Sequence, residues 1–302
     1  MSKKGTFVTY AEYAGVKSLI GIASIVPRRS IYGLMRGFSL LFYRLSAKRR
    51  RITIDNLRHA FPDLSDEEVG QLAREVYIEL SVTVSDILLM LTGRLDTDRM
   101  VENYDEALQK LEALRERCPQ GIIFMGAHFS NWELPPLFAS KHGFPMTVIG
   151  RRGDNRMIDE KLVLPFRAQY GNQTVYKKKA GISMLRTLRQ CGTVGLLIDQ
   201  KVNKENGFLV PFFGREAFTT HAVATLKLKA DPAIIPISMP RMARGRYRLN
   251  IGEAIDYRAD EIEDEEAKLL KRTERYNREL EAIIREYPAQ WLWMHDRWNK
   301  RV

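Results

Sequence analysis

The chain has 302 residues, of which 45% are hydrophobic and 28% charged, and its formal net charge is +11. This composition is typical of a globular protein with a sizeable core and excludes fibrous and low-complexity classes. A basic excess favours phosphate-bearing partners. Because the sequence has no zinc-finger spacing, RNA-binding aromatic signature or helix-turn-helix pattern, we expect an anionic membrane surface and not nucleic acid.

Two apolar segments open the chain. Residues 13–26 are too short to span a bilayer, which needs about 20 apolar residues, and Lys17 interrupts them. Residues 31–45 have apolar side chains at helical spacing and are followed by the basic run 48–51. This pattern predicts an amphipathic helix, or a hairpin with the preceding segment, that lies on anionic lipid. The alternative is an ordinary helix packed on the main domain.

The rest of the chain predicts an α/β domain. A helix is expected over residues 66–91, where Ser65 and Glu68 form a capping box, and another over 103–117. Strands and helices then alternate, which favours a layered α/β fold with a largely parallel sheet. The expected strands are 121–125, 146–149, 174–176, 194–198, 234–236 and 247–251, and the expected helices are 134–142, 157–170, 181–189, 221–230 and 261–286. We therefore predict a helical, membrane-associating extension over residues 1–60 and one α/β domain over residues 61–302.

The segment GIIFMGAHFSNWE, residues 121–133, carries the strongest chemical signal. An apolar strand ends in small residues and delivers His128, and a helix is expected to start at Ser130 or Asn131. On a continuous helix, His128 and Glu133 would point about 140° apart, so they meet only if the chain turns between them. A carboxylate on one imidazole nitrogen fixes the tautomer and leaves the other nitrogen as a base. We expect Glu133 to take that role for His128.

Three more polar residues follow expected strands, and ligands bind at the carboxyl edge of open α/β sheets. Arg151 is predicted to bind a phosphate or to polarise an acyl carbonyl. Asp199 is predicted to orient Arg151 or to bind a substrate amine or hydroxyl, and Arg241 to reach the same site. The two cysteines, Cys118 and Cys191, form no metal or redox motif, and neither a metal nor a cofactor is expected.

Six blocks in the same order resemble the bacterial lipid A biosynthesis (late) acyltransferases, a branch of the glycerolipid acyltransferase superfamily. They cover roughly residues 45 to 300. The blocks are RITIDNLRHAFPD (51–63), HFSNWE (128–133), GRRGDNRMID (150–159), GTVGLLIDQ (192–200), PFFG (211–214) and PAQWLWMHDRW (288–298). The chain departs from the family pattern at Lys201, where an acidic or small polar residue is common.

The resemblance implies an O-acyltransferase with a glycerolipid acyltransferase-like fold, whose catalytic residues are His128 and Glu133. It also implies an acyl thioester donor, acyl carrier protein or acyl-CoA, a lipid A precursor as acceptor, and the cytoplasmic face of the inner membrane. A lysophospholipid, a glycolipid or an amino-acid lipid remains an alternative acceptor. A non-catalytic lipid-binding protein is a further alternative, but lipid binding alone needs no base.

Overall fold

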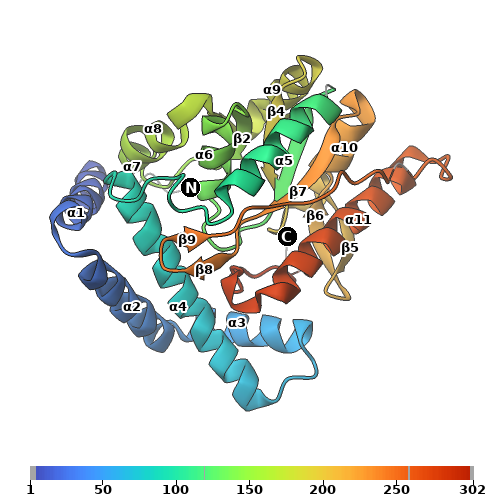
Figure 1. Ribbon diagram of the computed structural model, residues 1–302. Coiled ribbons are helices and arrows are strands. Elements are labelled where there is room, and N and C mark those ends of the chain that lie inside the picture. Colours follow the sequence, from blue (N-terminus) through green and yellow to red (C-terminus); the bar gives the residue numbers. More distant parts are fainter. Residues whose placement is uncertain (1–4, 119, 258, 300–302) are drawn as a thin grey trace.

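The computed structural model describes residues 5–118, 120–257 and 259–299. Its centre is a six-stranded sheet with the order β10-β7-β1-β4-β2-β3, in which every pairing is parallel except that of β10 with β7 (Figure 1). Helices cover the sheet, so the predicted α/β class with a largely parallel central sheet is confirmed. The sheet strands are β1 (Ile122–Gly126), β2 (Met146–Gly150), β3 (Gln173–Tyr176), β4 (Thr193–Leu197), β7 (Ala233–Ser238) and β10 (Asn250–Ile251).

The helices also follow the predicted order closely. The longer ones are α1 (Thr6–Ile25), α2 (Arg28–Leu45), α3 (Ala47–Ala60), α4 (Asp66–Leu91), α5 (Tyr104–Arg117), α6 (Leu134–Lys141), α9 (Lys177–Arg189), α10 (Ala222–Ala230) and α11 (Glu265–Glu286). The predicted capping box is present, because the Ser65 side chain accepts from the Glu68 amide and the Glu68 carboxylate accepts from the Ser65 amide. Helix α11 begins at Glu265, four residues later than expected, and Asp264 caps its first turn.

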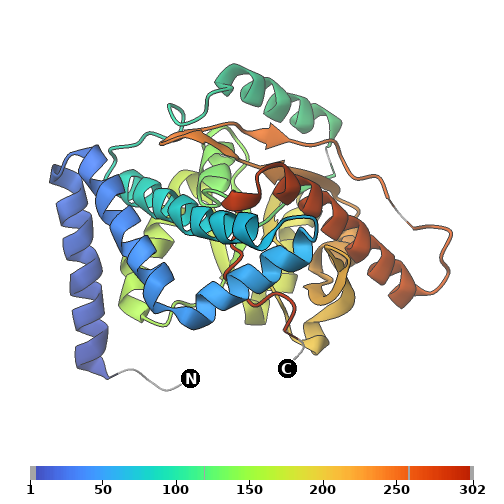
Figure 2. The same ribbon diagram turned by 90° about the horizontal axis from the view of Figure 1, so that it is seen from below.

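The first helices wrap the outside of the molecule. Helix α2 packs along α4 through Ile31, Tyr32 and Met35, as Figure 2 shows from below. The Tyr32 hydroxyl donates to the buried carboxylate of Asp86 on α4, and Tyr247 donates to the same carboxylate. These contacts tie α2 to the α/β domain. Within the described residues, no helix is both long and apolar enough to cross a membrane.

Three departures from the predicted elements have local causes. The helix expected over 157–170 is broken into α7 (Arg156–Ile158), a π-helical turn η1 (Asp159–Val163), α8 (Leu164–Arg167) and a 3-10 turn η2 (Gln169–Gly171). Tyr170 there has a left-handed backbone, φ 59°, which ends the α-helix. An unpredicted hairpin joins β5 (Gly207–Phe212) to β6 (Arg215–Thr220). The strand expected over 247–251 is divided, since β9 (Arg246–Tyr247) pairs with β8 (Arg241–Ala243) instead.

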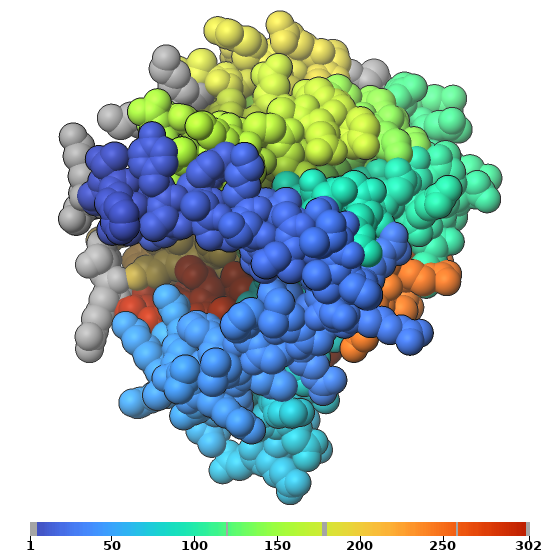
Figure 3. Space-filling view, turned by 90° about the vertical axis from the view of Figure 1, so that its left-hand side faces the viewer, coloured from blue at the N-terminus to red at the C-terminus, as the bar shows by residue number. Residues whose placement is uncertain are grey.

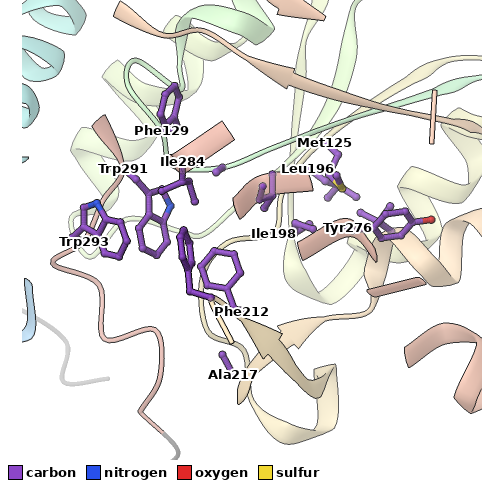
Figure 4. Packing of buried hydrophobic residues seen from close by; sticks show 14 of the residues in the cluster. Met125, Phe129, Leu196, Ile198, Phe212, Ala217, Tyr276, Ile284, Trp291 and Trp293 are labelled. Carbon is purple, nitrogen blue, oxygen red and sulfur yellow. The ribbon is translucent and has the colours of Figure 1, made fainter. Parts of the chain in front are cut away.

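The carboxyl-terminal segment forms part of the core. Of two further 3-10 helices, η3 (Lys204–Asn206) precedes β5 and η4 (Pro288–Gln290) follows α11. After η4, the chain turns inward with three buried tryptophans. Trp291 and Trp293 meet edge to face, with ring centroids 4.6 Å apart, and Phe212 packs against Trp291 (Figure 4). This segment contacts the residues that follow β1 and β4, because Trp291 pairs with Phe129 and donates to Asp199.

Candidate active site

The register of two central strands brings His128 and Asp199 together. Strands β1 and β4 are parallel neighbours, and Gly126 lies opposite Leu197. Each strand ends there, and two residues further along each chain come His128 and Asp199. Neighbouring parallel strands end at the same edge of a sheet, which is where ligands bind in open α/β folds.

Asp199 holds the imidazole of His128 in one orientation. Its Oδ1 lies 2.9 Å from His128 Nδ1, and its Oδ2 accepts from the His128 amide at 3.0 Å and from Trp291 Nε1 at 2.8 Å. The Asp199 side chain is 1% exposed and that of His128 23% exposed. An acceptor at Nδ1 places the ring proton on that nitrogen and leaves Nε2 as the basic atom. Nε2 makes no hydrogen bond with any described residue.

The electrostatics of this pair favour a basic imidazole. Burial by itself disfavours the charged ring, but the carboxylate of Asp199 and the more distant charge of Glu133 outweigh it and raise the pKa of His128. For Asp199, burial opposes ionisation, yet the imidazole and the hydrogen bonds from Trp291 and the His128 amide lower its pKa. Asp199 therefore remains ionised and stabilises an imidazolium at His128.

The predicted hydrogen bond between Glu133 and His128 is not found in the described structure. The loop after β1 turns at Ser130, where φ is 51°, and α6 begins only at Leu134. Glu133 instead accepts two hydrogen bonds from Arg167, one of them from Nε at 2.8 Å. Asp199 thus occupies the position expected for Glu133, and the Glu133 charge acts on His128 only through space.

Removing Arg167 will destabilise the fold, because the Glu133 side chain is 10% exposed and would lose its counter-charge. We expect Arg167→Met to lower the free energy of unfolding by about 3 kcal/mol, near the lower end for a broken buried ion pair. Adding Glu133→Gln should recover part of that loss, since no uncompensated charge then remains. Denaturant unfolding of the two single variants and the double variant measures the coupling. Additive effects would contradict a direct energetic interaction.

The two predicted arginines lie in different surroundings. Arg151 lines the rim of the cavity described below, and its side chain is 76% exposed beside Asp154. Arg241 is buried and is not among the residues that line the cavity, because its guanidinium donates to Glu79 and Thr83. The prediction that Arg241 reaches the site is therefore wrong. A contact between Asp199 and Arg151 is not found among the described residues, because Arg151 lies beside Asp154 while Asp199 binds His128 and Trp291.

His128 opens into a cavity of about 860 Å³. Its walls come from the ends of β1, β2 and β4, from α6, and from α9 and α10, so the cavity passes around the carboxyl end of β4 and reaches both faces of the sheet. Most of its walls are apolar, with His128, Glu133, Arg167 and Arg151 among the polar exceptions. A cavity of this size and lining suits an elongated apolar ligand with one polar group beside His128.

Sequence reasoning missed two residues of the site. Trp291 lies in the aromatic cluster of the core, and its indole N–H also positions Asp199. Arg167 lies in the broken helical stretch and has no motif that distinguishes it from a surface arginine. Nε2 of His295 accepts a hydrogen bond from the Lys201 amide at 3.0 Å. Burial lowers the pKa of His295, which favours its neutral form at the back of the site.

Comparison with known proteins shows the family to which the chain belongs. The family model described as bacterial lipid A biosynthesis acyltransferase matches residues 2–300. The chain is 26% identical over 294 residues to lipid A biosynthesis lauroyltransferase of Escherichia coli (strain K12), covering 93% of this chain and 90% of that protein. It is 23% identical over 256 residues to lipid A biosynthesis acyltransferase 2 of Shigella flexneri, covering 83% of this chain and 78% of that protein. The chain therefore belongs to the bacterial lipid A biosynthesis acyltransferase family and is an acyltransferase.

Proposed function

We propose that this enzyme transfers a fatty acyl chain from a thioester, carried by acyl carrier protein or CoA, to a hydroxyl of a lipid A precursor. The observation that carries the proposal is His128 held by the ionised Asp199 at the mouth of an apolar cavity. Family membership supports the acceptor class. A non-catalytic lipid-binding role is disfavoured, because a buried carboxylate that raises the basicity of one imidazole serves proton transfer and not lipid binding.

In the proposed reaction, Nε2 of His128 takes the proton of the acceptor hydroxyl as its oxygen attacks the thioester carbonyl. Asp199 stabilises the imidazolium that forms, as in triad chemistry without a serine. The tetrahedral intermediate collapses, the carbon–sulfur bond breaks, and the imidazolium returns the proton to the leaving thiolate. An ester and a free thiol result. Glu133 adds negative charge near the ring, and Arg151 at the rim is suited to a substrate phosphate.

Membrane association is the second part of the proposal, and it concerns α1 and α2. Leu34, Phe38, Leu41 and Leu45 follow one face of α2, and Leu45 is 75% exposed. Helix α1 adds Phe7, which is 85% exposed. Figure 3 shows these N-terminal helices bordering a hollow whose floor comes from the last third of the chain. Exposed apolar side chains beside a basic run suit the interface of an anionic bilayer, so we propose that this surface rests on the cytoplasmic face of the inner membrane.

Polar replacements on α2 test the membrane surface without exposing the core that α2 shares with α4. Phe38 is 56% and Leu41 50% exposed. Replacing both with serine is expected to weaken binding to anionic vesicles by about thirtyfold, or about 2 kcal/mol, because half of each side chain is available for burial. Vesicle flotation measures this, with Leu228→Ser on α10 as the matched control. Equal flotation of all three proteins would place the membrane contact elsewhere.

The acceptor is tested with the purified enzyme and mass spectrometry of its products. Acyl carrier protein and CoA thioesters are each offered with a lipid A precursor that lacks one secondary acyl chain, and separately with a lysophospholipid. We expect one acyl mass to be added to the lipid A precursor. Acylation of the lysophospholipid alone would overturn the proposed acceptor and retain the chemistry. No product with either acceptor, from folded enzyme, would contradict the proposal.

A further inference from the structure

The cavity has an arm beneath α6 whose floor is the sheet itself. Parallel strands are normally covered on both faces. Here Leu197, on the central strand β4, is 40% exposed, and the neighbouring Gly195 is half-buried on the same face. Pro136 and Leu137 of α6 form the opposite wall. The floor of this α6 arm consists of Phe124, Gly126, Val148, Gly195 and Leu197.

The width of the α6 arm depends on a missing side chain. A Cβ added at Gly195 would lie 2.9 Å from Met146 Sδ and 3.0 Å from Val148 Cγ1, too close for either atom to stay in place. Any side chain at this position therefore fills the arm or displaces Met146. Because the backbone of Gly195 is ordinary strand, space and not φ is what requires glycine here.

The buried Met146 lies at the end of the α6 arm furthest from the carboxyl edge of the sheet. Its amide donates to Asn172 Oδ1 at 2.9 Å. Asn172 Nδ2 in turn donates to Pro136 O and Ser140 Oγ, both at 3.0 Å, which ties β2 to α6. Register places Met146 beside Thr193, four residues before Leu197, so the floor runs about 13 Å from its mouth to its end.

We propose that the α6 arm holds the acyl chain of the donor and that Gly195 and Met146 set the longest chain accepted. This inference rests on the proposed function and names the site that selects its donor. The arm is apolar, its floor ends at the buried Met146, and it starts beside His128, where the thioester carbon must sit. A rigid end limits chain length, because each further methylene has to displace a hydrogen-bonded wall.

Two substitutions are expected to move chain-length preference in opposite directions. Gly195→Ala shortens the arm and lowers kcat/KM for the longest good donor by at least about tenfold relative to a donor two methylenes shorter. Met146→Ala deepens it and raises the relative kcat/KM of the longer donor, with a gain of about fourfold per newly buried methylene. The double variant Gly195→Ala/Met146→Ala is expected to return towards the wild-type order, since the side chain that the new methyl meets is gone.

The experiment measures kcat/KM of the full-length enzyme for acyl carrier protein thioesters of graded length, with thermal unfolding to check the fold. Met184→Ala is the matched control, because Met184 lines the same cavity on the opposite face of the sheet. It should leave the length order unchanged. If Met184→Ala changed the order of preference among donor chain lengths while Gly195→Ala and Met146→Ala did not, the donor chain would lie on the other face of the sheet. That result would overturn the inference. Wild-type enzyme that acylates no acceptor would instead contradict the proposed function.

Discussion

His128→Asn is expected to lower kcat by at least about a thousandfold, because it removes the imidazole that we propose as the general base. The asparagine side chain is suited to this test. Its amide nitrogen can take the position of His128 Nδ1 and keep donating to Asp199, whereas nothing replaces Nε2. His128→Ala would also leave the Asp199 carboxylate, 1% exposed, without its main partner and would mix a folding defect with the catalytic one.

His142 supplies the control for this experiment. Its Nε2 lies 3.0 Å from Asp98 Oδ1, so it too is a histidine paired with an aspartate, but it does not line the cavity. His142→Asn should turn over substrate at close to the wild-type rate. Single-turnover acyl transfer, followed by mass spectrometry with a lipid A precursor, measures both variants. Turnover by His128→Asn within tenfold of wild type would exclude His128 as the general base.

The strand ends were predictable from the sequence, and the pairing between them was not. Short apolar runs followed by His128, Arg151 and Asp199 predict polar groups at one edge of a parallel sheet. Which strands are neighbours depends on the order β1-β4-β2, which places β4 between two strands that precede it in the chain. Only that order puts Asp199, and not Arg151, beside His128.

Glu133 shows where local sequence reasoning fails. The spacing of five residues allows contact with His128 only if the intervening turn points both side chains inward. The turn is set by distant parts of the chain, because the Ser130 amide donates to Gln290 O and its carbonyl accepts from Thr83. Arg167, which lies in another distant segment, then donates to the Glu133 carboxylate. The sequence therefore predicted that His128 lies at the carboxyl edge of the sheet, while long-range packing decided the partner of each group.

Asp199→Asn is expected to reduce kcat by about 10⁴-fold, through the tautomer of His128 and not through a loss of fold. Two donors, the His128 amide and Trp291 Nε1, point at Asp199 Oδ2. An amide at this position satisfies both only by keeping its oxygen there, which turns its NH₂ group towards His128 Nδ1. That nitrogen must then accept, so the ring proton moves to Nε2 and the base is lost. Trp291→Phe in the same chain removes one of the two constraints and should restore part of the activity.

The pH dependence of the residual activity distinguishes this mechanism from simple distortion. In the wild type, the raised pKa of His128 means that activity falls with decreasing pH through a value above the ordinary 6.5, because the protonated ring is no base. Without the Asp199 charge, burial becomes the dominant influence and lowers the pKa, so the acid limb of kcat/KM should move to lower pH. Glu133→Gln should move it in the same direction but less, since Glu133 acts only through space. An acid limb that stays in place in Asp199→Asn would show that another group controls the titration of the base.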